Sequence, residues 1–373
     1  MDSASPPPAA ALPASLQLED LESRPLADAM TLPACAYTDP AFHEFDLRRI
    51  FAKSWQPVGR ADQLRAPGDH VVAGIAGKPI ILVRGHDRVL RGFFNVCKHR
   101  AGPLALVNGH ARHLHCKYHG WTYTLDGQLH AATEMQEAAC FDLSGIHLDP
   151  VQAAEWEGLA FAALQEPAVT LERLMQGVRE RIRPIALPQL RFHAQVVYDM
   201  ACNWKVYVDN YLEGYHLPHV HPGLNRLLDY RTYATVTSEW HSYQHSPLDG
   251  SGGPYEAGEA HYYFVYPNFM LNILPNRLQT NLVLPVSQRQ CRVVFDYFYA
   301  ETDPAAARGL IEDDMRFSDE VQREDIAICE RVQIGLESGA FHAGRLSPRR
   351  EAGVHHFQEL VRRTYRDALS PNP

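Results

Sequence analysis

Residues Asn203–His221 read NWKVYVDNYLEGYHLPHVH, and this is the most informative stretch of the chain. Its apolar side chains recur at steps of three and four residues, which is typical of one face of a helix. They are Trp204, Tyr207, Val208, Tyr211, Leu212 and Tyr215. Asp209, Glu213 and His216 are spaced at i, i+4 and i+7, so the same helix is expected to carry a second, polar stripe.

This helix is expected to end at Pro218, because proline lacks a backbone donor and disfavours helical geometry at the residue before it. A turn at this position would bring His221 back beside His216. Two histidines with a carboxylate nearby suit a mononuclear non-haem iron site that keeps open coordination positions. We interpret His219, which lies between the two in sequence, as a pocket residue rather than as a ligand.

Such a site needs a carboxylate as its third ligand, and the C-terminal part of the chain offers several. Asp325 interrupts an apolar helical stripe formed by Val321, Ile328, Val332 and Leu336. An aspartate on a core-facing stripe is costly unless it is paired or bound to metal. The neighbouring acids fall off the stripe and are expected to be solvated; they are Asp319, Glu320, Glu324 and Glu330. Asp325 is therefore the predicted third ligand.

A second group of metal-binding residues lies earlier in the chain, in two Cys-His pairs. Cys97 and His99 form the first pair, and Cys116 and His119 form the second, separated by 16 residues. Thiolate and imidazole bind either zinc or an iron–sulfur cluster. A two-iron cluster with two cysteines on one iron and two histidines on the other fits this spacing better than a zinc finger or ribbon. A structural zinc ion is the alternative.

The composition is that of an ordinary globular protein of 373 residues, with 46% hydrophobic and 21% charged residues. A formal net charge of −9 argues against non-specific binding to nucleic acid or to an anionic membrane surface. The chain has no apolar run of about 18 residues and no Lys or Arg before Arg24, so neither a membrane span nor a secretory signal is expected. The seven cysteines show no disulfide pattern, and a cytoplasmic location is predicted.

The length is comfortable for two hydrophobic cores. Residues 1–40 include a Pro- and Ala-rich run and are expected to be a disordered tail. Residues 41–165 are predicted to form a leading helix and a small all-β domain, with strands at 70–75, 79–84 and 89–96 and a hairpin signalled by Asp126-Gly127.

Residues 166–373 are predicted to form a larger α+β domain, an antiparallel sheet with covering helices (helix-grip type). Its helices are expected at 170–182 and 304–336, in addition to the one at Asn203. Its strands are expected at 230–246, 261–275, 278–286 and 291–300.

The stretches Cys97–Arg100 (CKHR) and Cys116–Tyr123 (CKYHGWTY), followed by Asp126-Gly127, resemble the cluster-binding signature of Rieske non-haem iron oxygenase α subunits. Residues 203–221 look like the iron-binding helix of that family, and residues 321–336 look like the segment that supplies its carboxylate. The sequences of both helices are most similar to the branch of choline monooxygenase and the glycine betaine and carnitine oxygenases. The motif His355-His356-Phe357 near the C-terminus resembles the same branch.

The resemblance implies a [2Fe-2S] Rieske cluster on Cys97, His99, Cys116 and His119, and a mononuclear Fe(II) on His216, His221 and Asp325. It places Glu213 where the family has an acid that links a cluster histidine of one subunit to an iron histidine of its neighbour. A homotrimer is implied by the same arrangement. Asp209 is predicted to support the iron site, with a solvated acid as the alternative for both Asp209 and Glu213.

The predicted function is hydroxylation of a quaternary ammonium compound of the choline, glycine betaine or carnitine type, with O2 as co-substrate. Aromatic faces would attract the cation, but they would equally stack on an aromatic substrate. The aromatic candidates for the pocket, each with a place in the core as the alternative, are Tyr207, Tyr211, Tyr215, Tyr262, Tyr263, Phe264 and Tyr266. The alternative is therefore a ring-hydroxylating dioxygenase acting on an aromatic acid. A Rieske-type electron carrier or a zinc-stabilised binding protein would leave the predicted iron site without a use.

No Gly-rich dinucleotide loop is visible, so electrons from NAD(P)H are expected to arrive through a separate ferredoxin or flavin/[2Fe-2S] reductase. Lys98, Arg100 and Lys117 would make the rim of the cluster basic in an otherwise acidic protein, and an acidic partner is predicted to dock there.

Overall fold

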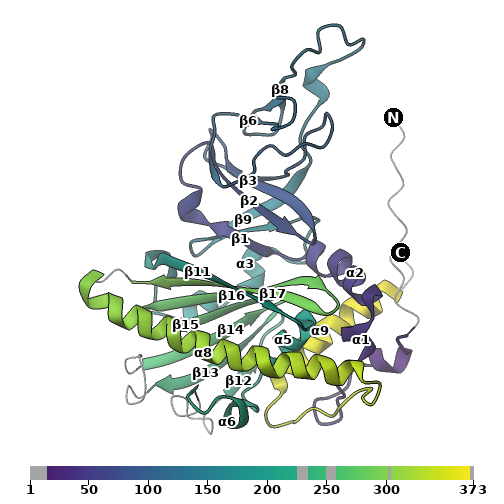
Figure 1. Cartoon of the computed structure of the whole chain (residues 1–373), viewed down its shortest axis with the longest axis vertical. Coiled ribbons are helices and arrows are strands. Elements are labelled where there is room, and N and C mark those ends of the chain that lie inside the picture. The colour runs from purple at the N-terminus through teal and green to yellow at the C-terminus, as the bar shows by residue number, and fades with distance from the viewer. Residues whose placement is uncertain (1–14, 225–233, 249–257, 301–303, 370–373) are drawn as a thin grey trace. The chain divides into compact units, whose positions relative to one another are not determined.

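The computed structural model describes residues 15–224, 234–248, 258–300 and 304–369, and these form two compact units (Figure 1). The smaller unit is Phe51–Arg173. The larger unit combines Met1–Ile50 with Leu174–Pro373. Among the described residues, no helix has both the length and the apolar character needed to cross a membrane.

The smaller unit is built of antiparallel sheets. Its main sheet has the strand order β1-β10-β9-β4-β3-β2-β5, and a three-stranded sheet has the order β6-β7-β8. The strands are β1 (Gln56–Arg60), β2 (Asp69–Ile75), β3 (Lys78–Arg84), β4 (Leu90–Phe94), β5 (Gly109–His110), β6 (Leu114–His115), β7 (Thr122–Tyr123), β8 (Leu129–Ala131), β9 (Pro150–Trp156) and β10 (Leu159–Ala163). Short 3-10 turns occur at η2 (Phe51–Lys53), η3 (Ala61–Gln63) and η4 (Leu143–Gly145). The expected small all-β domain is confirmed.

The larger unit is organised around one antiparallel seven-stranded sheet in the order β11-β17-β16-β15-β14-β13-β12. Its strands are β11 (Arg191–Met200), β12 (Ala234–Thr237), β13 (His241–Leu248), β14 (Gly258–Val265), β15 (Phe269–Leu274), β16 (Arg277–Ser287) and β17 (Gln290–Tyr299). The expected strand at 261–275 is thus two strands, β14 and β15. The α+β class with an antiparallel sheet and helices is confirmed.

The helical elements of the larger unit are η1 (Leu18–Leu21), α1 (Cys35–Thr38), α2 (Pro40–Arg49), α4 (Val178–Arg181), η5 (Leu187–Gln189), α5 (Trp204–Tyr211), α6 (Leu217–Val220), α8 (Pro304–Glu337) and α9 (Ala352–Leu369). Helix α5 contacts β16, β17 and α8. Figure 1 shows the long helix α8 running along the sheet. Tyr198 on β11 and Tyr297 on β17 donate hydrogen bonds to Asp319 and Ser318 of α8, which fixes this helix on the sheet.

The expected helix at 170–182 is interrupted. It consists of α3 (Leu171–Leu174), which lies at the boundary of the two units, and α4. Gly177 separates them with a φ of +84°, a left-handed conformation that glycine adopts without steric cost and that ends a helix.

The prediction of a disordered tail over 1–40 is wrong for residues 15–40, whereas residues 1–14 lie outside the described part of the chain. Leu32 is fully buried, and its backbone N–H donates to Gln358 Oε1 over 2.8 Å. Arg362 Nη2 donates to the Met30 carbonyl over 2.7 Å. The segment is ordered because α9, more than three hundred residues later, supplies partners for its backbone.

The leading helix α2 groups with the larger unit and not with the small β domain, so the domain boundary falls near residue 51 instead of residue 41. Phe42 and Phe45 each pack on the Tyr365 ring of α9, with ring centroids 5.3 Å apart. Asp46 is fully buried and accepts hydrogen bonds from Lys205 Nζ and Tyr365 Oη over 2.5 and 2.8 Å. A buried carboxylate needs such partners, and all of them lie in the larger unit.

The prediction that Pro218 ends the helix of residues 203–217 is wrong. Helix α5 ends at Tyr211, and Pro218 lies in the first turn of α6. Between them Glu213 accepts hydrogen bonds from the backbone N–H groups of Tyr215 and His216, so the chain turns here and the expected polar stripe does not continue. Proline is tolerated at the start of a helix because its missing N–H would have no helical partner there.

Candidate metal centres

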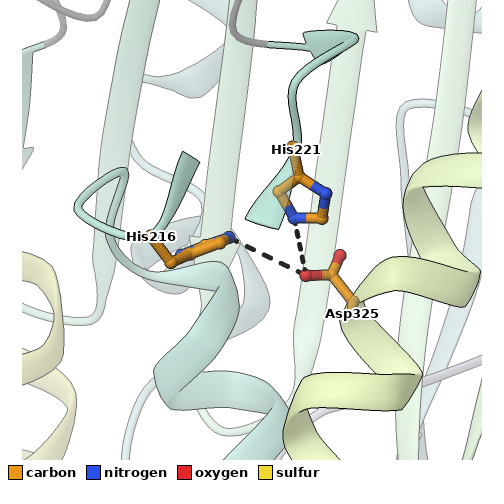
Figure 2. Close-up of side chains that lie close together, drawn as sticks. All are labelled: His216, His221 and Asp325. Atoms are coloured by element: carbon orange, nitrogen blue, oxygen red, sulfur yellow. Dashed lines mark hydrogen bonds and ion pairs between the residues drawn. The ribbon is translucent and has the colours of Figure 1, made fainter. Parts of the chain in front are cut away.

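Three side chains of the larger unit converge between α6 and α8 (Figure 2). His216 Nε2 lies 3.7 Å from Asp325 Oδ1, and His221 Nε2 lies 2.9 Å from the same oxygen. One ligand atom from each residue falls within 4.8 Å of the others, and this is the one such group of three or more His, Cys, Asp or Glu among the described residues. The structure therefore brings together the three predicted iron ligands.

Both histidines are oriented by a carboxylate on the opposite side of the ring. His216 Nδ1 donates to Glu213 Oε1 over 2.6 Å, and His221 Nδ1 donates to Glu324 Oε2 over 2.7 Å. A proton held on Nδ1 leaves the lone pair of Nε2 for a metal, which is how metal-binding histidines are usually fixed. The residues present therefore fit a mononuclear metal with two imidazoles and one carboxylate.

Glu324 is a correction to the sequence analysis, which expected a solvated acid. Its side chain is 31% exposed, but it holds a histidine that is 1% exposed. Burial lowers the pKa of His221, yet the carboxylates of Asp325 and Glu324 outweigh burial and raise it above its usual value. Asn210 is another residue that the sequence analysis missed, since its Nδ2 donates to Asp325 Oδ1 over 2.6 Å.

Among the described residues, the side chain of Asp209 makes its hydrogen bonds outside this convergence. Its two oxygens accept hydrogen bonds from Tyr37 Oη over 2.7 Å and from Gln358 Nε2 over 3.1 Å. Burial raises the pKa of Asp209 to about 7, although these hydrogen bonds act in the opposite direction. Asp209 therefore ties α5 to α1 and α9, and the expectation of a solvated acid does not hold. His219 is exposed and does not line the cavity described below.

The two Cys-His pairs of the smaller unit lie on its loops. Cys97 follows β4, and the second pair lies in the turn between β6 and β7. Cys97 and Cys116 belong to one hydrophobic core cluster and are 2% and 4% exposed. The rings of His99 and His119 lie edge to face, with centroids 4.6 Å apart. The structure thus separates a thiol pair from an imidazole pair, as a two-iron Rieske cluster requires.

Buried polar atoms near the two Cys-His pairs also favour a two-iron cluster. The Nδ1 atoms of His99 and His119 are buried and have no hydrogen-bond partner among the described residues. A buried polar atom without a partner is costly, and ligation would satisfy both nitrogens. Tyr123 Oη lies 3.3 Å from Cys97 Sγ and accepts from the Lys98 backbone N–H, so a hydroxyl is held against one thiol. The residues present therefore fit a [2Fe-2S] cluster.

A cavity of about 130 Å³ opens beside the three converging residues of the larger unit. Its lining includes aromatic side chains from α5, α8 and the sheet: Tyr207, Tyr211, Tyr262, Phe295 and Phe317. The sequence had suggested the first three as pocket candidates and had missed the two phenylalanines. Among its other candidates, Tyr215 is half exposed, and Tyr263 points to the opposite face of the sheet because neighbouring residues of a strand alternate.

Residues 54–142 match the Rieske [2Fe-2S] domain, and residues 187–367 match the ring hydroxylating alpha subunit (catalytic domain). The chain is 38% identical to the chloroplastic choline monooxygenase of Arabidopsis thaliana over 90% of this chain and 83% of that protein. It is 32% identical to the carnitine monooxygenase oxygenase subunit of Escherichia coli (strain K12), over 91% and 95% of the two chains.

Among solved structures, that of the quaternary ammonium Rieske monooxygenase CntA in complex with an inhibitor superposes with a TM-score of 0.83 at 29% identity, over 92% of this chain and 99% of that one. Naphthalene 1,2-dioxygenase shares the fold, with a TM-score of 0.76 at 15% identity. The chain belongs to the Rieske non-haem iron oxygenases. Its cofactors are therefore a [2Fe-2S] cluster and a mononuclear iron, which together use O2 and electrons supplied by a reductase.

Proposed function

We propose that the chain is the oxygenase component of a monooxygenase that hydroxylates a quaternary ammonium compound of the choline, glycine betaine or carnitine type. The observation that carries the proposal is the similarity, over nine tenths of the chain, to enzymes named for choline and for carnitine. His216, His221 and Asp325 would hold the iron, and Cys97, His99, Cys116 and His119 would hold the cluster.

The cavity supports this substrate class. Its aromatic faces carry partial negative charge, which attracts a cation that has no hydrogen to donate. The carboxylates of Glu213 and Asp325 border the same cavity and add negative potential near the iron residues. A trimethylammonium group would therefore be attracted to the end of the cavity where the reaction takes place.

Iron held by His216, His221 and Asp325 would supply the activation of O2, and a cluster held by the smaller unit would supply the electrons. One oxygen atom would enter a C–H bond of the substrate, and the other would leave as water with two protons and two electrons. Hydroxylation of an N-methyl carbon would give formaldehyde and a demethylated amine. Hydroxylation of the carbon that bears the alcohol oxygen would give an aldehyde.

Electron delivery is the second part of the proposal. Glu213 accepts a hydrogen bond from His216 Nδ1, and this contact supports a role for Glu213 in connecting that histidine to an electron donor. We infer a homotrimer in which the cluster of one subunit reaches Glu213 of its neighbour, and a separate ferredoxin or reductase that supplies the cluster. A cytoplasmic location likewise stays a prediction.

The alternative is dioxygenation of an aromatic acid, because the same aromatic side chains could stack on a ring. Oxygen consumption with a surrogate reductase and NADH separates the two, with choline, glycine betaine, carnitine and benzoate-type acids as substrates and with the product identified. Coupled turnover of an ammonium compound is the expected result. Coupled turnover of aromatic acids alone would refute the proposed substrate class.

A further inference from the structure

The sheet side of the cavity carries a chain of polar residues on β16. Arg277, Gln279 and Asn281 alternate with their neighbours, so they share one face of the strand and all three line the cavity. Arg277 Nη2 donates to Gln279 Oε1 over 2.5 Å, and Gln279 Nε2 donates to Asn281 Oδ1 over 2.8 Å. An ammonium group and an iron site need no such polar row, so these side chains must serve another part of the ligand or the fold.

Among the described residues that line this cavity, Arg277 is the one lysine or arginine. Its relative exposure is 6%. Its Nε lies 2.7 Å from Asp314 Oδ2 in an ion pair, and Tyr299 Oη donates a hydrogen bond to the same oxygen over 2.5 Å. Asp314 does not itself line the cavity. The aspartate therefore holds the guanidinium from the helix side, while the guanidinium borders the space in which a substrate would lie.

A purely structural ion pair is the simpler explanation, but it does not account for the position of Arg277 beside the cavity. Burying two charges costs several kcal/mol per ion before their attraction is counted, so a pair inside a core is often replaceable by apolar residues. The arginine of this pair is buried but borders the catalytic cavity, and the ion pair with Asp314 holds its guanidinium there. An oriented guanidinium with its fork toward a cavity is a common way to bind a carboxylate.

The distance between the Arg277–Asp314 pair and the iron residues determines how long a ligand must be to reach both. Asp314 and Asp325 are eleven residues apart on α8, which corresponds to about 16 Å along the helix axis. Arg277 and the iron residues therefore occupy different ends of the cavity. A ligand that reaches both must be extended, with its ammonium group at the iron end and an acidic group at the other.

We propose that Arg277 binds the carboxylate of an extended ω-trimethylammonium acid and thereby selects such zwitterions over choline. This inference rests on the proposed function, because it assigns the tail of the same substrate. Asn281 and Gln279 line the cavity between the two ends and position the chain of the acid.

Two compounds of equal length test the assignment. They are 4-(trimethylammonio)butanoate and (4-hydroxybutyl)trimethylammonium, which differ in the terminal group alone. Calorimetric titration of the fully loaded oxygenase measures their Kd values, and product formation with a surrogate reductase measures their KM values. The wild-type protein is expected to bind the acid about tenfold or more tightly than the alcohol, because a charge-assisted pair replaces a neutral hydrogen bond.

Two variants and one control test whether Arg277 causes the preference for the acid over the alcohol. Removal of both partners in the double variant R277Q/D314N avoids leaving a buried aspartate unpaired, and it should reduce the acid-to-alcohol ratio to within about threefold. Arg277→Lys keeps the charge but not the fork and should give an intermediate ratio. Arg292→Lys is the matched control, since Arg292 Nε likewise forms an ion pair with an aspartate, Asp199, over 2.7 Å but on the exposed side of β17.

Retention of the wild-type ratio in the double variant, or equal binding of acid and alcohol by the wild-type protein, would overturn the inference and leave the proposed function in place. If no ammonium compound is turned over and benzoate-type acids are, both the proposed function and this inference fail. A ratio that also collapses in Arg292→Lys would show a general loss of structure and would count against the assignment of Arg277.

Discussion

His221 is 1% exposed and donates its Nδ1 proton to Glu324 Oε2 over 2.7 Å, one residue before the predicted iron ligand Asp325 on the same helix. The pairing gives α8 two functions at adjacent positions, because Asp325 would bind the metal and Glu324 would orient a second ligand. Since His221 is buried, its ring has few other ways to satisfy Nδ1. Glu324 is therefore a positioning residue of the iron site.

Glu324→Ala should weaken iron binding by about tenfold to a hundredfold, because loss of a partner that orients a metal-binding histidine has effects of this size. The measurement is iron content after dialysis against a graded chelator, with cluster absorbance as an internal reference. Glu320→Ala is the control, since Glu320 is exposed on the same helix. Equal iron retention in both variants would contradict the role of Glu324.

Asp209 should make the larger unit less stable as pH rises. Burial raises its pKa from 3.8 in the unfolded chain to about 7, so the folded state holds a proton that the unfolded state has lost between these values. The stabilising contribution is complete below pH about 4 and is lost as pH rises to about 7. Denaturant unfolding at several pH values measures it.

Asp209→Asn removes this dependence. The free energy of unfolding of the variant, relative to the wild-type protein, should rise by a few kcal/mol between pH 4 and pH 7 and then stay level. Asp313→Asn is the control, because Asp313 is exposed on α8. Parallel pH profiles for wild type and Asp209→Asn would show that Asp209 is ionised in the folded protein throughout this range.

The residues that the structure brings together as candidate metal ligands could be selected from the sequence because their signals are local. Asp325 interrupts an apolar stripe, and each Cys-His pair of the cluster is contiguous within a few residues. Glu324 could not be recognised in this way, because its partner lies 103 residues away in sequence. Pro218 was misread for a different reason, since the same fixed φ that ends one helix also suits the first turn of the next.

The order of residues 15–40 has a similar cause. This segment buries apolar side chains such as Leu21 and Leu32, and its backbone is satisfied by side chains of α9 such as Gln358 and Arg362. No sequence pattern within residues 15–40 predicts those partners. The same holds for Arg277, whose meaning depends on a cavity formed by β16, α5 and α8 together.

Tyr123→Phe should lower the reduction potential of the cluster. The Tyr123 hydroxyl lies 3.3 Å from Cys97 Sγ, and a hydrogen bond to a ligating sulfur stabilises the reduced, more negative cluster. A shift on the order of tens of millivolts to more negative values is expected in a redox titration followed by electron paramagnetic resonance. Tyr118→Phe serves as control, since Tyr118 is 56% exposed on the neighbouring loop. An unchanged potential in Tyr123→Phe would show that the hydroxyl does not donate to the cluster.

The three basic residues near the cluster should differ in their effect on reduction by the electron donor. Lys98 forms an ion pair with Asp149, so its charge is already compensated, whereas Arg100 lies over the Tyr118 ring and Lys117 is exposed. Lys117→Glu should therefore slow cluster reduction more than Lys98→Glu at low salt, and the difference should shrink as salt screens the encounter. Stopped-flow reduction by an acidic ferredoxin at increasing ionic strength measures both. If the rate of cluster reduction changes neither with the two substitutions nor with salt, the donor docks elsewhere on the protein.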